Sequence, residues 1–191
     1  LEKIKFDSLS LKKQHKESYI DFSAIAKGYA VDIITRYLNN KNLLNYFVEI
    51  GGEVRASGKN ISDKYWLVGV EDPKFSLSSD IFATVSLNNL SLATSGNYRN
   101  FYNLKDSLVY HTIDPKSGYP SRSNMLSASV FAKSCFIADA YATSFMALGF
   151  EKSKKIVSSI DGLDALVVYI NEEGDTTKYL SEGIRNSINL L

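Results

Sequence analysis

The chain has 191 residues, of which 45% are hydrophobic and 23% are charged, as in an ordinary soluble globular protein. Its 22 basic and 21 acidic side chains give a formal net charge of +1, which argues against nucleic acid or an anionic membrane as a partner. A single cysteine excludes an internal disulfide, and no apolar run approaches the roughly 20 residues that span a bilayer. The length suits one domain over residues 1–191.

Hydrophobic periodicity predicts the following elements in chain order. The first half is expected to hold an edge strand at 1–11, a polar turn at 12–18, a helix at 23–38, and strands at 45–50, 65–70, 81–87 and 90–94. The second half is expected to hold strands at 108–113 and 125–132, helices at 135–148 and 151–160, and strands at 165–170 and 177–180. Asn88–Asn89 is typical of a hairpin turn. This order predicts an α+β fold, with a largely antiparallel sheet packed with helices.

The helix at 135–148 carries Asp139 and Thr143, which share one helical face because they are four residues apart. A carboxylate and a hydroxyl are hard oxygen ligands of the kind that Mg²⁺ prefers. Spacing alone favours a solvated aspartate and a threonine at the edge of the core over a metal site, because such pairs are common on helices.

A second candidate site lies where the helix at 23–38 begins. Ser23 is predicted to be its N-cap, and the free N–H groups of the first turn, together with Lys27, predict an anion site. Gly28 is costly inside a helix, which indicates close approach by another group. An amphipathic helix with an exposed lysine is the plainer interpretation.

His111 lies at the end of a predicted strand and could act as a general base or as an orienting donor. Taken by itself, the pattern favours an ordinary strand histidine followed by a turn. The glycine-bearing turns Gly51–Gly52 and Thr94-Ser95-Gly96 could admit a ligand to the backbone, or could simply be turns.

The order and the residues of several sequence segments, taken together, identify a protein family more specifically than any one segment does. The chain closely resembles the ApbE family of bacterial FAD:protein FMN transferases over about residues 19–150. The segments that carry the resemblance are DFSAIAKGYAVD, IGGEVRASG, WLVGVEDP, LATSGNYRNF, HTIDPKSGYP and ADAYATSFMALG, in that order. Ser23–Ala24 stands where the family often has two glycines, and part of the family's N-terminal region is expected to be missing from this chain.

The resemblance implies a role for each candidate residue. Magnesium would be held by Asp139, Thr143 and the backbone carbonyl of Ala24, and His111 would activate the acceptor hydroxyl. The residues implied to contact or line FAD are Asp21, Lys27, Tyr29, Thr94, Ser95, Gly96, Thr112 and Ile113.

The implied activity is Mg²⁺-dependent transfer of FMN from FAD to a threonine or serine hydroxyl of an acceptor protein, with release of AMP. Two alternatives remain open: a Mg²⁺-dependent FAD pyrophosphatase that yields FMN and AMP, and a non-catalytic flavin-binding protein. The resemblance further implies an acceptor in a membrane redox complex or an extracytoplasmic flavoprotein. It implies a location in the periplasm or on the outer face of the cytoplasmic membrane, with a lipid anchor.

Overall fold

The computed structural model of the chain describes residues 3–73, 80–96, 101–104, 107–110, 113, 117–119 and 123–191. Its helices are α1 (Ala26–Asn40), α2 (Cys135–Leu148), α3 (Phe150–Ser159) and the 3₁₀ helix η1 (Glu182–Ser187). Its strands are β1 (Ile4–Phe6), β2 (Leu11–Lys13), β3 (Tyr46–Ile50), β4 (Glu53–Ser57), β5 (Trp66–Glu71), β6 (Ile81–Leu87), β7 (Leu90–Gly96), β8 (Phe101–Leu104), β9 (Ser107–Tyr110), β10 (Met125–Ala132), β11 (Asp164–Ile170), β12 (Thr176–Leu180) and β13 (Ile188–Leu190).

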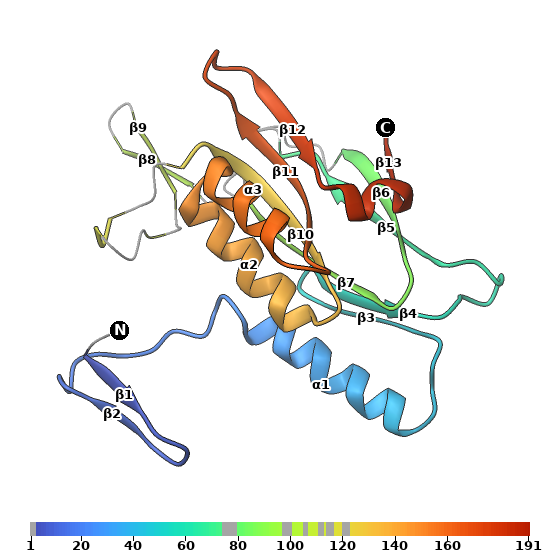
Figure 1. The fold of residues 1–191 in the computed structure, drawn as a ribbon, viewed down its shortest axis with the longest axis horizontal. Helices are drawn as coiled ribbons and strands as arrows, with labels where there is room; N and C mark the ends of the chain where they lie inside the picture. Colours follow the sequence, from blue (N-terminus) through green and yellow to red (C-terminus); the bar gives the residue numbers. More distant parts are fainter. Residues whose placement is uncertain are drawn as a thin grey trace.

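The elements form layers around a six-stranded sheet of order β12-β11-β10-β7-β4-β3. Helices α1, α2 and α3 cover one face of this sheet, and the three-stranded sheet β13-β6-β5 lies against the other (Figure 1). The β1–β2 hairpin projects away from these layers, at the end of the segment that leads into α1 (Figure 1). All strand pairings among the described residues are antiparallel, which confirms the predicted fold class.

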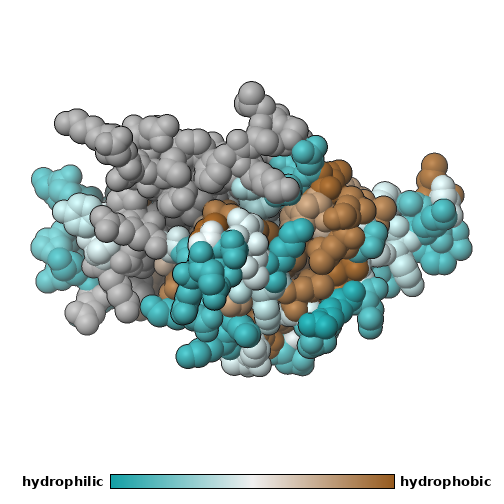
Figure 2. All heavy atoms as spheres, turned by 90° about the horizontal axis from the view of Figure 1, so that it is seen from above, coloured by the Kyte–Doolittle hydropathy of each residue, from teal (hydrophilic) through white to brown (hydrophobic). Residues whose placement is uncertain are grey.

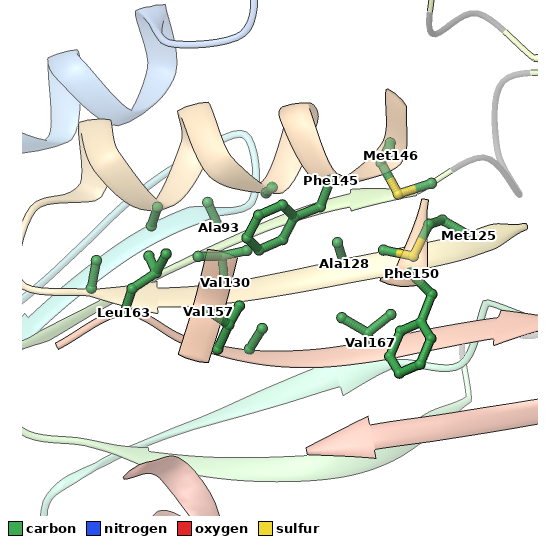
Figure 3. Close-up of a cluster of buried hydrophobic side chains, with 14 residues drawn as sticks. Ala93, Met125, Ala128, Val130, Phe145, Met146, Phe150, Val157, Leu163 and Val167 are labelled. Atoms are coloured by element: carbon green, nitrogen blue, oxygen red, sulfur yellow. The ribbon is translucent and has the colours of Figure 1, made fainter. Parts of the chain in front are cut away.

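Strand β10 shows how one strand supplies both core layers. Ala128 and Val130 pack with Phe145 of α2 on the helix side of the sheet (Figure 3). Phe131, the residue after Val130, packs on the other side with Leu92 and with residues of the three-stranded sheet. Because successive strand side chains point to opposite faces, a strand buried on both faces is apolar at nearly every position. The run predicted at 125–132 therefore matches β10 residue for residue.

The hairpin predicted around Asn88–Asn89 is wrong. The two flanking strands exist at the expected positions, and Asn89 has a turn-like φ of +50°. However, β6 pairs with β5 and β13, whereas β7 pairs with β4 and β10. Both edges of each strand are therefore occupied, and the chain crosses at Asn88–Asn89 from one sheet to the other. Phe82 of β6 and Leu92 of β7 belong to the same core cluster, because the two strands lie in sheets that pack against each other.

The N-terminal prediction also needs correction, because residues 1–11 do not form one strand. Asp7 accepts hydrogen bonds from Leu9 N at 2.9 Å and Ser10 N at 2.7 Å, and this side-chain turn separates β1 from β2. Strand β2 then extends to Lys13, inside the predicted polar turn at 12–18.

Some large apolar side chains remain exposed on the three-stranded sheet, including Leu67 of β5 and Ile81 of β6. Hydrophobic residues gather on the side of the molecule where β5, β6 and β13 lie when it is seen from above (Figure 2). Among the described residues, no helix combines the length and the apolar character needed to cross a membrane.

Candidate functional site

The site is built on a close contact between α1 and α2. Gly28 N of α1 donates a hydrogen bond of 2.9 Å to Asp139 Oδ2 of α2, and the Asp139 side chain is buried. A Cβ atom on Gly28 would lie 2.4 Å from Cys135 O and 2.8 Å from Asp139 Cβ. Only a residue without a side chain fits there. This confirms the prediction that Gly28 marks a close approach, and the approaching group is α2.

Asp32, one turn further along α1, fixes the start of α2. Its carboxylate accepts from Ser134 Oγ at 2.6 Å, Cys135 N at 2.9 Å and Phe136 N at 3.0 Å. Free N–H groups at a helix start need acceptors, and a carboxylate there also complements the helix dipole. Gly28 and Asp32 together set the position of α2, and with it the position of Asp139.

The electrostatics of Asp139 suit a bound cation. Burial raises the pKa of this carboxyl above its ordinary value, and the Gly28 N–H and the Lys27 charge oppose that rise. Within the described part of the chain, Gly28 N is the hydrogen-bond donor that reaches Asp139. A buried carboxylate with spare acceptor capacity is stabilised when a cation binds it.

Thr143 lies one turn beyond Asp139, on the same face of α2. Its Oγ1 is 3.2 Å from Ser95 Oγ of β7, so that α2 and β7 bring two hydroxyls together. Thr94, the preceding residue in β7, is directed differently: its Oγ1 is 2.8 Å from Ser129 Oγ of β10. Because neighbours in a strand face opposite ways, Ser95 belongs to the Asp139 face and the Thr94 side chain does not. Gly96 ends β7 next to Ser95.

Lys27 is held by the turn between β3 and β4. Its Nζ lies 2.7 Å from Glu53 Oε2 and 3.2 Å from Gly51 O. Burial raises the pKa of the Glu53 carboxyl, and the Lys27 ammonium acts against that rise. The sequence pattern did not single out Glu53. The available signal was a charged residue that opens a strand directly after a glycine pair.

The segment before α1 differs from the prediction. The N-cap position is Ile25, and Ser23 instead donates from its N and its Oγ to Asp21 Oδ1. These hydrogen bonds, the hydroxyl first, lower the pKa of Asp21, which is fully exposed. Ala24 lies in the turn between these residues and α1. Of the first N–H groups of α1, Ala26 N bonds to Phe22 O, and Gly28 N bonds to Asp139.

The predicted anion site is therefore partly filled by acceptors of the protein itself, which leaves the Lys27 ammonium as its main positive charge. Tyr29 is half exposed on α1, and its ring meets that of Phe136 edge to face at 6.4 Å. Ile113 is half exposed. His111 and Thr112 lie outside the described residues, so that their roles stay predictions.

The donor set fits a magnesium ion of the kind that keeps most of its positions for water and phosphate. The structure places the Asp139 carboxylate and the Thr143 hydroxyl one turn apart on one face of α2, and it places Ala24, whose carbonyl is the third expected ligand, in the turn before α1. In the described ranges no three histidine, cysteine, aspartate or glutamate side chains cluster as a metal site. The protein would thus contribute few ligands, with Asp139 as the charged one.

Solved flavin transferases share this layered fold. The flavin transferase ApbE from Vibrio cholerae matches with a TM-score of 0.84 and 32% identity, over 97% of this chain and 58% of that chain. An ApbE protein from Thermotoga maritima matches with a TM-score of 0.81 and 28% identity, over 97% of this chain and 59% of that chain.

The chain belongs to the ApbE family, whose sequence model matches residues 1–167. Curated relatives include the FAD:protein FMN transferases of Haemophilus influenzae, 36% identical over 90% of this chain, and of Escherichia coli strain K12, 35% identical over 88% of it. These matches cover 49% and 47% of the two relatives. The chain therefore spans about half the length of the curated relatives it matches.

Proposed function

We propose that this chain transfers FMN from FAD to a threonine or serine hydroxyl of an acceptor protein in a Mg²⁺-dependent reaction. The observation that carries the proposal is the buried Asp139 carboxylate at the α1–α2 contact, with the Lys27 charge close enough to influence its pKa. Membership of the ApbE family supports it, because curated relatives are named FAD:protein FMN transferase. We include in the proposal an acceptor in a membrane redox complex or an extracytoplasmic flavoprotein. We also include a location in the periplasm or on the outer face of the cytoplasmic membrane, with a lipid anchor.

In the proposed reaction, the acceptor oxygen attacks the phosphorus on the FMN side of the FAD pyrophosphate. A new P–O bond to the acceptor forms, the bond to the bridging oxygen breaks, and AMP leaves. The hydroxyl proton passes to His111. Phosphoryl transfer depends mainly on positioning and on neutralising charge.

The residues of this chain supply that positioning. Asp139, Thr143 and the Ala24 carbonyl would hold Mg²⁺, which supplies positive charge to the phosphate oxygens when bound. Gly28 N keeps the Asp139 carboxylate in one orientation, and Ser95 keeps the Thr143 hydroxyl in place. Lys27 adds a positive charge at the start of α1. Tyr29 and Ile113 offer partly exposed apolar surface for the nucleotide.

The test is mass spectrometry of a threonine-bearing acceptor domain incubated with the chain, FAD and Mg²⁺, with an EDTA control. A metal-dependent gain of one FMN, with AMP released, is the expected result. Free FMN and AMP without acceptor modification would replace the transferase with a pyrophosphatase. Intact FAD throughout would leave a flavin-binding protein.

Asp139→Asn sharpens the test, because the amide oxygen can still accept from Gly28 N while the charge is lost. We expect transfer to fall by on the order of 100-fold or more, since a metal contributes several kcal/mol to charge stabilisation. Asp161→Asn, in an exposed turn, is the matched control and should leave the rate unchanged. Wild-type transfer by Asp139→Asn would refute the assignment of Asp139 as the charged metal ligand.

A further inference from the structure

The Gly51–Gly52 turn encloses a side chain of the protein. Gly51 has a φ of +59°, and a Cβ atom there would lie 3.2 Å from Lys27 Cδ. Its carbonyl oxygen lies 3.2 Å from Lys27 Nζ, and Glu53, the first residue of β4, reaches the same ammonium at 2.7 Å. The turn and the start of the strand thus form a cradle around the end of Lys27.

The two partners of this ion pair differ in exposure. The Glu53 side chain is 4% exposed, whereas the Lys27 side chain is 46% exposed. A lysine ammonium has three N–H donors, of which one is donated to Gly51 O, while Glu53 Oε2 contacts the same ammonium as an ion-pair partner. Among the described residues, these contacts leave donor capacity and the exposed side of the ammonium for a ligand. The buried Glu53 carboxylate therefore holds the Lys27 ammonium in place, while the ammonium itself remains partly exposed to solvent.

The burial of the Glu53 carboxylate carries a desolvation penalty. Removing it from water opposes folding, and an apolar residue of similar volume often packs as well or better. Val54 and Ala56, on the same strand, are apolar and join the core between the sheets. Because successive strand side chains alternate, Glu53 lies on the opposite face of β4 from Val54 and Ala56, and there it reaches Lys27.

We propose that Glu53 is a positioning residue that fixes the Lys27 ammonium in place before the nucleotide pyrophosphate arrives. This inference rests on the proposed function and adds a residue to it. Glu53 touches no substrate in this role, because it acts through Lys27. A lysine that is already ordered loses less side-chain freedom when a phosphate binds, so that affinity increases. The negative charge of Asp139 also contributes to the raised pKa of Glu53. The Lys27 ammonium acts on both carboxyls and lowers the pKa of each.

The first experiment is a double-mutant cycle on FAD affinity, measured by quenching of flavin fluorescence. Glu53→Gln is expected to raise the Kd about 5- to 10-fold, as a preorganised charge contact is lost. In a Lys27→Gln background, the same substitution should change the Kd by less than about 2-fold, because its target is gone. An equal loss of affinity in both backgrounds would overturn the proposal, since Glu53 would then act independently of Lys27.

The matched control is Glu49→Gln on the neighbouring strand β3. Glu49 is exposed and its Oε1 accepts from Gly52 N at 2.7 Å, a bond that glutamine can keep. Glu49→Gln should leave the FAD affinity equal to that of its parent protein in each background, whether the wild type or Lys27→Gln. Thermal unfolding of each variant separates lost affinity from lost fold.

A second measurement does not depend on flavin. The rate at which an amine-acylating reagent modifies Lys27 is compared with that of Lys16, whose side chain is 93% exposed, by peptide mass spectrometry. Glu53→Gln should speed Lys27 modification about 3-fold or more, because the amine is then released from the ion pair that holds it against the β3–β4 turn. An unchanged rate would overturn the positioning role. If the wild-type chain binds no FAD, the proposed function fails, and the labelling rate alone decides whether Glu53 holds Lys27.

Discussion

Replacing Gly28 by alanine tests whether the α1–α2 contact is as tight as described. The added Cβ would meet Cys135 O at 2.4 Å, Cys135 C at 2.7 Å and Asp139 Cβ at 2.8 Å. Two of these three atoms belong to the backbone of α2, which cannot rotate away as a flexible side chain can. The helices must therefore separate, and the hydrogen bond from Gly28 N to Asp139 must lengthen.

Three contributions set the expected change in the free energy of unfolding. Overpacking costs about 1–3 kcal/mol. Weakening a hydrogen bond to a buried charged group adds up to about 1.5–3 kcal/mol. Alanine gains about 1 kcal/mol over glycine in helix propensity. The balance predicts that Gly28→Ala destabilises the protein by about 2–4 kcal/mol, although alanine is the better helix former.

Urea unfolding followed by circular dichroism measures this change, with the slope of the transition required to stay constant. Arg36→Ala, at an exposed position of α1, is the control and should stay within about 0.5 kcal/mol of the wild type. A neutral or stabilising Gly28→Ala would show that helix propensity dominates. The contact between α1 and α2 would then be looser than these distances require.

Three further outcomes are expected. Asp32→Ala should destabilise the protein by about 1–3 kcal/mol in thermal or urea unfolding, because residues 134–136 lose their hydrogen bonds to its carboxylate; an unchanged stability would contradict that capping role. Burial raises the pKa of Glu53 above the ordinary value of a glutamate, so its contribution to stability is present below about pH 4.5 and is lost as the pH rises through the folded-state pKa. Glu53→Gln should reduce this pH dependence of the free energy of unfolding, measured by urea unfolding between about pH 4 and 7. An unchanged dependence on pH would contradict a raised pKa of Glu53. His111→Ala should retain FAD binding and slow FMN transfer by about 100-fold or more, as expected for a lost general base, and equal losses of both would make His111 a binding residue.

The local hydrophobic pattern predicted those elements in which burial follows a regular pattern along the whole length. The apolar run at 135–148 matches α2 at both ends, because Ser134 and Gly149 flank it as cap residues. Strand β4 was missed because Glu53 and Arg55 interrupt its apolar residues, and these polar side chains find partners only in the folded protein. A sequence window does not contain those partners, since Lys27 is distant in the chain and Ser91 lies on β7.

The crossing at Asn88–Asn89 shows a related limit of local reasoning. A turn pair between two strands is typical of a hairpin, and the turn itself is present. Whether the strands pair depends on which neighbours occupy their edges, and β5, β13, β4 and β10 occupy all of them. Strand pairing is a property of the whole sheet, so that the turn residues alone could not decide it.

The candidate site follows the same logic, because each of its parts depends on a contact between distant segments. Asp139 is buried because α1 lies directly against α2, and α1 can lie there because residue 28 has no side chain. Lys27, the residue before Gly28, is thereby directed toward the β3–β4 turn. There Gly51 leaves room for the Lys27 methylene groups, and the Glu53 carboxylate pairs with the ammonium. Gly28 thus determines both how deeply the Asp139 carboxylate is buried and where the Lys27 ammonium points. Substitutions at this contact should consequently change stability and nucleotide affinity together, whereas Glu53→Gln should change affinity only when Lys27 is present.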